Sequence, residues 1–510
     1  MTPTSFTTRE GAKRASALAV IGVLVAVLVA VSAAAGQNRL DRDRGARHLV
    51  VGPGVVSNSG SSSQSPGANE SAGGSGASSG SGAAGAVSAA SASSSSSSGS
   101  GPRIGSGPAV AGASGSQAVY DPGVTDTSIT VGGSTFLSGP AAVYGDQLAT
   151  GLQAALNVIN SQGGVNGRKF KLILYDDGAD PAKQLANTKR LVEVDHVFAL
   201  TMIYAPGQLG QYVASQGVPV FTEGQFDEEF INPWWFATGG PQRSGSIAIA
   251  EKAAQMGAKK AAIFYLNAGG GNYTDAYAQT VAGDFQSLGI SVAFTESMQP
   301  TQSDCTDGMT KASTQGVDFI DFELDVGHTI PCVLSAQEEN YKPAKGWGGY
   351  LIGVPATPQG IGAYSAGMWA VDAFAPIYGN PTYLQAVHNV NPQVEAVSSP
   401  TAGMYTAAWL MASGIQQLGS DITRQRLRSV LNTFTDWVPS FLNPSDSQEP
   451  HYTFRPNCHV GLGSFYYLQV RQNPSNSSDY EFYQASPFQP FLVDKPASTN
   501  PLYTCRQAEP

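Results

Sequence analysis

The chain has 510 residues, of which 13% are charged, about half of the ~25% usual in soluble domains. Its formal net charge of −10 argues against a nucleic-acid-binding protein, because phosphate contacts require clustered Lys and Arg. Only one stretch is apolar enough to span a membrane, which excludes a channel or a membrane-embedded transporter. No CxxC motif is present, so zinc ribbons and thioredoxin-type sites are excluded as well.

The N-terminal region has the composition of an export signal or a membrane anchor. Residues 1–15 are polar and partly basic, and residues 16–35 carry no charge. A helix needs about 20 residues to cross the hydrocarbon core, so this stretch is long enough. Because the basic side comes first, everything downstream is expected outside the cytoplasm. Residues 16–35 are either a signal peptide, cleaved near the small residues 32–35, or an uncleaved transmembrane anchor.

Residues 36–117 are predicted to be a disordered linker. From about residue 51 this segment is almost entirely Ser, Gly and Ala, which cannot bury enough apolar surface to offset the entropy of ordering. A long spacer suits a domain that is fixed to a membrane at one end. The linker therefore favours the uncleaved anchor, with residues 1–15 as a cytoplasmic tail.

From residue 118 onward, strand-like and helix-like segments alternate. A strand near 129–131 is followed by a helix with one apolar stripe, and Asp180 with Pro181 has the pattern of a helix start. Strands separated by helices form parallel sheets with helices on both faces. Because there are more such units than one sheet comfortably holds, we predict an α/β fold with two Rossmann-like lobes. The stripe consists of Leu148, Leu152, Ala155, Leu156 and Ile159, and the chain is expected to end in a hairpin of strands at 464–471 and 480–484.

Four segments carry a resemblance to a known family: SGPAAVYGDQ at 138–147, NVINSQGGVNG at 157–167, YDDGADP at 175–181, and YTF at 452–454 with HVG at 459–461. They resemble type I periplasmic binding proteins, in particular the leucine and branched-chain amino-acid receptors of ABC importers. The resemblance covers roughly 125–495 and implies two lobes, three crossovers and a ligand clamped in the cleft between the lobes. It implies lobe 1 at about 125–238 and 356–436, lobe 2 at about 241–353 and 456–495, and hinges near 238–240, 354–355 and 436–455.

The resemblance also implies roles for individual residues. Tyr144 and Tyr273 lie where the family keeps aromatic side chains that face the ligand. Asp325 lies near the place of a second-lobe aromatic residue, and Tyr350 near that of a ligand-contacting acid. At positions where amino-acid receptors have small hydroxyl residues, this sequence has Ile203 and Phe226. We therefore expect classical α-amino acids to bind weakly.

The residues at the predicted strand ends indicate the same region, because ligands of open α/β sheets bind beyond the carboxyl ends of the strands. These residues are aromatic or acidic and include no Lys or Arg, so an anionic ligand would lack its usual partner. Aromatic rings with carboxylates suit a cation or a hydroxyl-rich neutral ligand. The alternative is that the aromatic residues belong to the lobe cores and the carboxylates to solvated loops. The candidate ligand-binding residues are Tyr144, Tyr204, Glu223, Phe226, Tyr273, Glu323, Asp325 and Tyr350.

Other features carry no separate function. The acidic run at 227–229 is interpreted as solvated charges at a helix start. The six histidines form no HExxH motif, so we expect no metal site, no cofactor and no catalytic residue. Export permits disulfides. Cys305 and Cys332 open helices one βα unit apart and are predicted to pair, which leaves Cys458 with Cys505; the alternative is that Cys305 is a free buried thiol.

Together these expectations describe an exported, membrane-tethered solute-binding protein. It would capture a small polar ligand and deliver it to the permease of an ABC importer, without a nucleic-acid partner and without enzymatic activity. The alternative is a ligand-sensing or surface interaction domain on the same fold, with no transport role. If the N-terminal helix is cleaved, the protein would be secreted rather than anchored at the cell membrane.

Overall fold

A computed structural model describes residues 55–57, 118–138, 142–203, 207–267, 273–372, 374, 377, 379–442, 450–456, 458–461, 464–487 and 489–490. The chain divides into two units, Met1–Ser57 and Asn58–Pro510, and in the first only strand β1 (Val55–Ser57) is described. Within the described residues, no helix is both long and apolar enough to cross a membrane. Strand β1 lies within the linker expected to be disordered at 36–117 and departs from that expectation. The expected span at 16–35 and the rest of the linker lie outside the described residues and stay predictions.

Within the second unit, the first sheet has the strand order β3-β2-β4-β5-β6, and these strands are all parallel. Helices connect each strand to the next, as the alternation in the sequence predicts. The strands are β2 (Ser128–Thr135), β3 (Lys169–Asp176), β4 (Ala199–Thr201), β5 (Val220–Thr222) and β6 (Trp235–Ala237). The helices between them are α2 (Ala142–Ser161), α3 (Pro181–Glu193), α4 (Gln208–Gln216) and α5 (Asp227–Ile231).

Local sequence explains the helices of this lobe. Every residue of the predicted apolar stripe on α2 is buried, so the stripe forms the core-facing side of that helix. The Asp180 carboxylate accepts hydrogen bonds from the backbone N–H groups of Ala182 at 2.8 Å and Lys183 at 3.2 Å, and Pro181 occupies the first turn of α3. The predicted helix start at Asp180 is thus confirmed.

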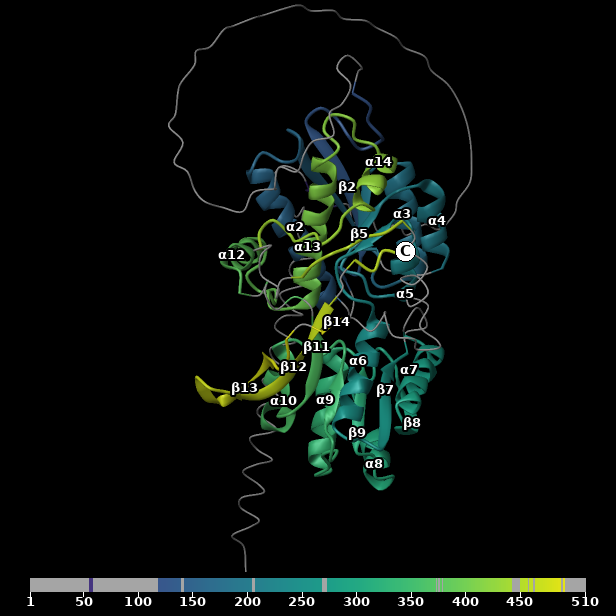
Figure 1. Ribbon diagram of the computed structural model, residues 1–510, viewed down its shortest axis with the longest axis vertical. Helices are drawn as coiled ribbons and strands as arrows, with labels where there is room; N and C mark the ends of the chain where they lie inside the picture. The colour runs from purple at the N-terminus through teal and green to yellow at the C-terminus, as the bar shows by residue number, and fades with distance from the viewer. Residues whose placement is uncertain are drawn as a thin grey trace, which may run out of the picture. The chain divides into compact units, whose positions relative to one another are not determined.

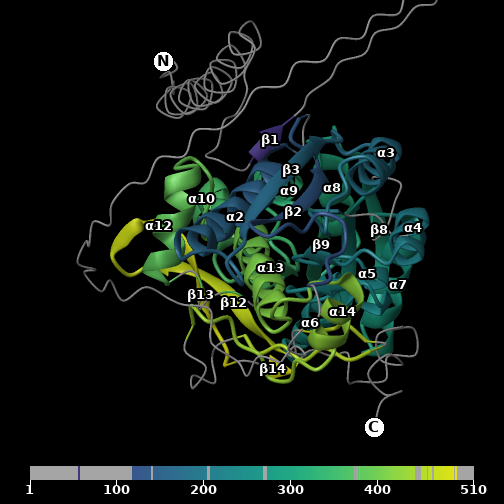
Figure 2. The same ribbon diagram turned by 90° about the horizontal axis from the view of Figure 1, so that it is seen from above.

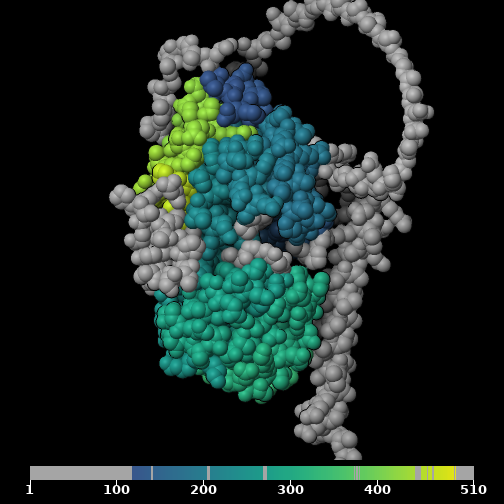
Figure 3. Space-filling model, turned by 90° about the vertical axis from the view of Figure 1, so that its right-hand side faces the viewer, coloured from purple at the N-terminus to yellow at the C-terminus, as the bar shows by residue number. Residues whose placement is uncertain are grey.

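The second sheet has the order β13-β12-β11-β10-β9-β7-β8, and β14 pairs with β12. Strands β7 to β11 are parallel, whereas β12 and β13 form an antiparallel hairpin at the edge. Figure 3 shows the parallel part with its helices as one continuous green-teal body. The strands are β7 (Lys260–Leu266), β8 (Ser291–Met298), β9 (Phe319–Glu323), β10 (Trp347–Gly349), β11 (Trp369–Asp372), β12 (Ser464–Asn473), β13 (Asn476–Gln484) and β14 (Gln489–Pro490). The helices are α6 (Gln242–Gln255), α7 (Asp275–Ser287), α8 (Thr306–Thr314), α9 (Val326–Glu338), α10 (Ala356–Ile361) and the 3-10 turn η1 (Gly362–Ser365).

After the second sheet is nearly complete, the chain returns to the first lobe with α12 (Pro381–Val390), α13 (Ser399–Gln416) and α14 (Arg424–Leu431). Figures 1 and 2 show α13 side by side with α2. Their backbones approach closely at Gly151, where any side chain would collide with the carbonyl group of Thr401. The chain then crosses a third time, to the hairpin of β12 and β13.

Two of the predicted lobe boundaries are wrong. The prediction places residues 356–372 in lobe 1, but β11 pairs with β10 and β12 in the second sheet, so the crossover lies after Asp372. The resemblance implies a hinge near 354–355, yet Pro355 is the N-cap of α10. The last boundary, placed at 456, is also too early, since the N–H of His459 donates to the carbonyl of Phe230 in lobe 1 at 2.7 Å.

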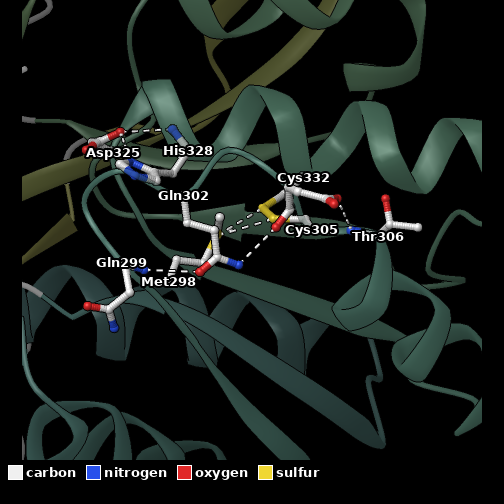
Figure 4. Close-up of a disulfide and its surroundings, with 9 residues drawn as sticks. Met298, Gln299, Gln302, Cys305, Thr306, Asp325, His328 and Cys332 are labelled. Carbon is white, nitrogen blue, oxygen red and sulfur yellow. Dashed lines mark hydrogen bonds and ion pairs between the residues drawn. A yellow bond between two sulfur atoms is a disulfide. The ribbon is translucent and has the colours of Figure 1, made fainter.

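A disulfide joins Cys305, the N-cap residue of α8, to Cys332 in α9, with a Cα–Cα distance of 4.8 Å. Both sulfurs are buried against the sulfur of Met298, at 3.3 and 3.4 Å (Figure 4). This is the predicted pair and not a free thiol. Cys458 is also disulfide-bonded, and its predicted partner, Cys505, lies outside the described residues.

We expect the double variant Cys305→Ala/Cys332→Ala to lose roughly 3–4 kcal/mol of unfolding free energy, because the bond closes a loop with a sequence separation of 27 residues. Urea unfolding of the variant and the oxidised wild-type protein measures this difference. Peptide mapping without reductant should recover the two cysteines in one linked pair. A free thiol at either position, or a link from Cys305 to Cys458, would contradict the assignment.

Candidate ligand-binding site

Most of the predicted site residues lie directly beyond the carboxyl end of a parallel strand. Glu223 follows β5, Glu323 is the last residue of β9, and Tyr350 follows β10. Tyr144 lies in the first turn of α2, after β2, and Tyr273 lies just before α7, after β7. Because parallel strands end at the same edge of a sheet, these side chains gather at one edge of each lobe.

On the first lobe, Tyr144 and Glu223 form one wall. The Tyr144 hydroxyl donates a hydrogen bond to Oε1 of Glu223, and the ring stacks on Phe136 with the centroids 5.6 Å apart. Glu223 is buried, and α13 packs directly against it at Gly403, where a side chain would collide with the Cβ of Glu223. The wall is thus fixed by both the helix after β2 and the returning helix α13.

Gln225, which sequence analysis missed, connects the two lobes. Its side-chain N–H donates to the hydroxyl of Tyr273, and the ring of Tyr273 meets Phe226 edge-on at 6.0 Å. The loop that carries Gln225 and Phe226 is held by Glu229, whose Oε2 accepts from their backbone N–H groups at 2.8 and 3.4 Å. Lobe 1 therefore presents a fixed polar loop to the second lobe.

Glu229 corrects one interpretation of the sequence. In the acidic run at 227–229, Glu228 is exposed as expected, but only 2% of Glu229 is accessible. Burial raises the pKa of Glu229 to about 8. The charge pattern of a helix start could not reveal this, because it does not show that the Glu229 carboxyl group turns inward to the backbone N–H groups of Gln225 and Phe226.

The first turn of α6 positions the second lobe's side of the site. The side-chain N–H of Gln242 donates to Oε2 of Glu323 at 3.0 Å, and the next residue, Arg243, donates to Oδ1 of Asp284 at 2.7 Å. The Tyr350 hydroxyl donates to the carbonyl of Gly240 at 2.8 Å. The ring of Tyr350 lies against Gly245, where a Cβ would overlap it, so this close approach requires glycine.

Buried carboxyl groups dominate the electrostatics beneath this turn. Burial raises the pKa of Asp227 to about 7 and that of Asp284 to about 6, although Arg243 lowers both. Burial also raises the pKa of Glu323, and it raises that of Asp321, two residues earlier on β9, far above its usual range. The neutral form of these acids is therefore favoured where no cation compensates for the loss of water.

The remaining predicted residues have different places. Asp325 is the N-cap of α9: it accepts from the backbone N–H of His328 at 3.0 Å and pairs with the Nδ1 of that ring at 2.8 Å (Figure 4). Its side chain is half exposed, and its charge reaches Tyr273, whose pKa it helps to raise after burial. Tyr204 lies outside the described residues. Ile203 is packed in the first lobe's core, and Phe226 contacts Tyr273.

The structure thus brings together Tyr144, Glu223, Phe226, Tyr273, Glu323 and Tyr350 and adds Gln225 and Gln242. These side chains offer carboxylate, phenol and amide groups beside aromatic rings, which can form hydrogen bonds with a ligand and stack on it. Among the described residues, no group of three His, Cys, Asp or Glu side chains could hold a metal ion.

Comparison with known proteins identifies the family. The model of the periplasmic binding protein family matches residues 128–473. The chain belongs to this family. Among curated relatives, the Leu/Ile/Val-binding protein of Citrobacter freundii is 24% identical over 201 residues, which is 38% of this chain and 53% of that protein. The Leu/Ile/Val-binding protein of Escherichia coli K12 is 40% identical over 67 residues, or 13% of this chain and only 18% of the length of the relative.

Solved structures show the same fold at low sequence identity. A branched-chain amino-acid ABC transporter protein from Thermus thermophilus with bound valine has a TM-score of 0.62 and 16% identity, and the match covers 76% of this chain and all of that one (100%). A fatty acid ABC transporter substrate-binding protein from Thermomonospora curvata has a TM-score of 0.58 and 18% identity, covering 71% and 93%. The resemblance to type I branched-chain amino-acid receptors, and with it the two-lobed α/β fold, is confirmed.

The buried Glu229 predicts a pH dependence of stability. Its folded pKa is raised, so its contribution is complete below the unfolded value near 4.3 and is lost as the pH rises through about 8. Glu229→Gln keeps an acceptor for the two N–H groups but removes the titration. Relative to wild type, the variant should gain stability on the order of 3 kcal/mol between pH 5 and pH 8.

Urea unfolding at several pH values measures this difference. Glu228→Gln is the matched control, because the neighbouring exposed side chain should leave the pH profile unchanged. Parallel profiles for wild type and Glu229→Gln would show that Glu229 is ionised in the folded protein and contradict the assignment.

Proposed function

We propose that this protein is an exported solute receptor that captures a small polar ligand between its two lobes and delivers it to the permease of an ABC importer. The observation that carries the proposal is the set of polar and aromatic side chains at the strand ends of both lobes, joined by the bond between Gln225 and Tyr273. Membership of the periplasmic binding protein family supports it. A ligand-sensing or surface interaction domain would use the same site without transport. Uptake assays distinguish this alternative from an importer receptor.

The lining supports a neutral or cationic ligand rather than an anionic one. Glu223 and Glu323 are buried at the site, and Arg243 is bound to Asp284. The relatives are named for leucine, isoleucine and valine, and the Thermus thermophilus structure holds valine. A zwitterion of that kind brings a carboxylate, for which Ile203 and Phe226 offer no hydrogen bond. We therefore propose that this chain takes a ligand of different chemistry.

We expect Tyr144→Ala to weaken binding of the true ligand about 10- to 100-fold, or ~1.4–2.8 kcal/mol, because the ring and its hydroxyl form the wall with Glu223. A thermal-shift screen of amino acids, amides, polyamines and sugars identifies the ligand, and calorimetry measures its affinity. Val143→Ala is the matched control, since that neighbour on the same turn of α2 is 67% exposed. Unchanged affinity in Tyr144→Ala would place the site elsewhere, and submicromolar leucine binding would refute the expected ligand chemistry.

We also propose that residues 16–35 stay attached as a membrane anchor. The uncharged stretch, its basic flank and the Ser/Gly/Ala-rich segment after it support an anchor that carries the receptor on a spacer. Cell fractionation should find the protein in the membrane, with its N-terminal residues intact. An exported protein whose sequence begins near residue 34 or 36 would show cleavage and disprove the anchor.

A further inference from the structure

Two carboxylates from opposite lobes act on the same tyrosines. Glu223 belongs to the loop after β5 of the first lobe, and Glu323 ends β9 of the second. Both charges help to raise the pKa of Tyr273 and of Tyr350, after burial itself. Hydrogen bonds connect this region: Gln242 donates its side-chain N–H to Glu323 at 3.0 Å and its backbone N–H to the carbonyl of Gln225 at 3.2 Å, and Gln225 donates to the hydroxyl of Tyr273.

Beneath Glu323, Asp321 lies in a position that is unusual for a charged residue. It is two residues earlier on β9, so its side chain lies on the same face of the sheet as Glu323. Asp321 is 0% exposed, and within the described part of the chain neither of its carboxyl oxygens has a hydrogen-bond partner. The charges that act on it are those of Glu323 and Asp284, both negative. A buried acid in such surroundings keeps its proton.

The guanidinium of Arg243, which lies near these acids, already binds Asp284. Arg243 is also the cation that acts on Glu323. The internal segments that are not described, from 139–141 to 462–463, contain no Lys, Arg or His in their sequence. The lobes therefore place two acidic groups of β9 and the carboxylate of Glu223 beside aromatic rings, with one engaged guanidinium as compensation.

We propose that the ligand is a small organic cation, whose ammonium group lies between Glu223 and Glu323, and that its binding releases a proton held by Asp321 and Glu323. This inference rests on the proposed receptor function and specifies its ligand class. A neutral ligand would bring these acids no counter-charge, and an anion would place a further negative charge beside them. An ammonium ion supplies the missing counter-charge and the N–H donors, and Tyr144, Tyr273 and Tyr350 supply rings for its alkyl part.

The proton balance is simple. In the ligand-free protein the pair formed by Asp321 and Glu323 holds at least one proton, and on binding one carboxyl group becomes a carboxylate while the proton passes to the buffer. The other charged or titratable groups that face the pair are Arg243 from α6, Asp284 and Tyr277 from α7, Asp227 from α5, Glu223 from the loop after β5, and Tyr273 and Tyr350 from the second lobe. Of these, Asp227 lies on α5 of the first lobe and interacts with Arg243 at the start of α6.

The first experiment is a thermal-shift screen of the full-length protein against a library balanced in charge. It includes matched sets on one skeleton: choline with 3,3-dimethylbutan-1-ol, and putrescine with butane-1,4-diol and succinate. We expect the hits to be cations, and their neutral counterparts to bind at least about 10-fold more weakly. A neutral, zwitterionic or anionic hit that binds more tightly than every cation would overturn this inference but leave the receptor function intact. If no small molecule shifts the melting temperature, the proposed function itself fails.

The second experiment measures the proton. Calorimetric titration of the best hit near pH 7 in phosphate and in Tris, which differ in ionisation enthalpy, should show that about one proton is released per ligand bound. Equal binding enthalpies in the two buffers would contradict the exchange. This measurement uses the wild-type protein and does not depend on whether a variant folds.

Variants then assign the groups. Glu323→Gln should weaken the cation at least about 10-fold but its neutral counterpart less than about threefold, because only the cation loses a charge partner. Asp321→Asn should reduce the proton release, since its amide cannot titrate. Glu296→Gln is the matched control, because that residue lies on β8 of the same sheet and pairs with Lys311. Equal losses for cation and neutral compound in Glu323→Gln would indicate a structural role only and overturn the assignment.

Discussion

The first turn of α6 holds the contacts on which the geometry of both lobes depends. Its first residue, Gln242, receives the chain from the crossover at 238–241, and its backbone N–H donates to the carbonyl of Gln225 in the first lobe at 3.2 Å. The side chain of the same residue donates to Glu323 of the second lobe at 3.0 Å. Arg243 then anchors the helix to α7 through Asp284, and Gly245 admits the ring of Tyr350. The first turn of α6 therefore contacts both the polar loop at Gln225 in the first lobe and the end of β9 at Glu323 in the second, and so sets their relative position.

This arrangement explains why a single guanidinium serves several acids. Arg243 is fully buried, and a buried ion pair broken by the loss of one partner costs about 3–5 kcal/mol, because the remaining charge has no water. Asp284 is the partner that compensates the charge of Arg243, because its Oδ1 accepts a hydrogen bond from the guanidinium at 2.7 Å. Asp227 accepts from the backbone N–H of Arg243 across the crossover, so the same residue also connects α5 to α6. The position of the first lobe is thus coupled to the charge balance inside the second.

Features that depend on local sequence pattern could be predicted, whereas features that depend on how side chains meet in the folded protein could not. The buried stripe on α2, the cap of α3 at Asp180 and the residues at the strand ends follow from periodicity, capping and parallel topology. Gln225, Glu229 and Gln242 could not be found in this way, because a polar residue at a helix start is ordinarily solvated. Gln225 and Gln242 bind partners far away in the sequence, such as Gln242 with Glu323, 81 residues apart, and Glu229 turns inward to the backbone of the loop before its own helix. The lobe boundary predicted near 355 is too early for a similar reason. Strand β11 belongs to the second sheet because it pairs with β12, which lies nearly 100 residues later in the chain.

Strand β9 shows why the polar site is more than a by-product of the fold. Its sequence FIDFE alternates, with Ile320 and Phe322 in the apolar core and Asp321 and Glu323 on the opposite face. Central parallel strands are usually apolar on both faces, because helices cover both sides. Replacing a buried charged group by a well-packed apolar one is often neutral or stabilising by about 1–4 kcal/mol, so folding alone does not require these acids. Two acids on one face of an interior strand fit the cation site proposed above, because folding alone gives no reason to keep them there.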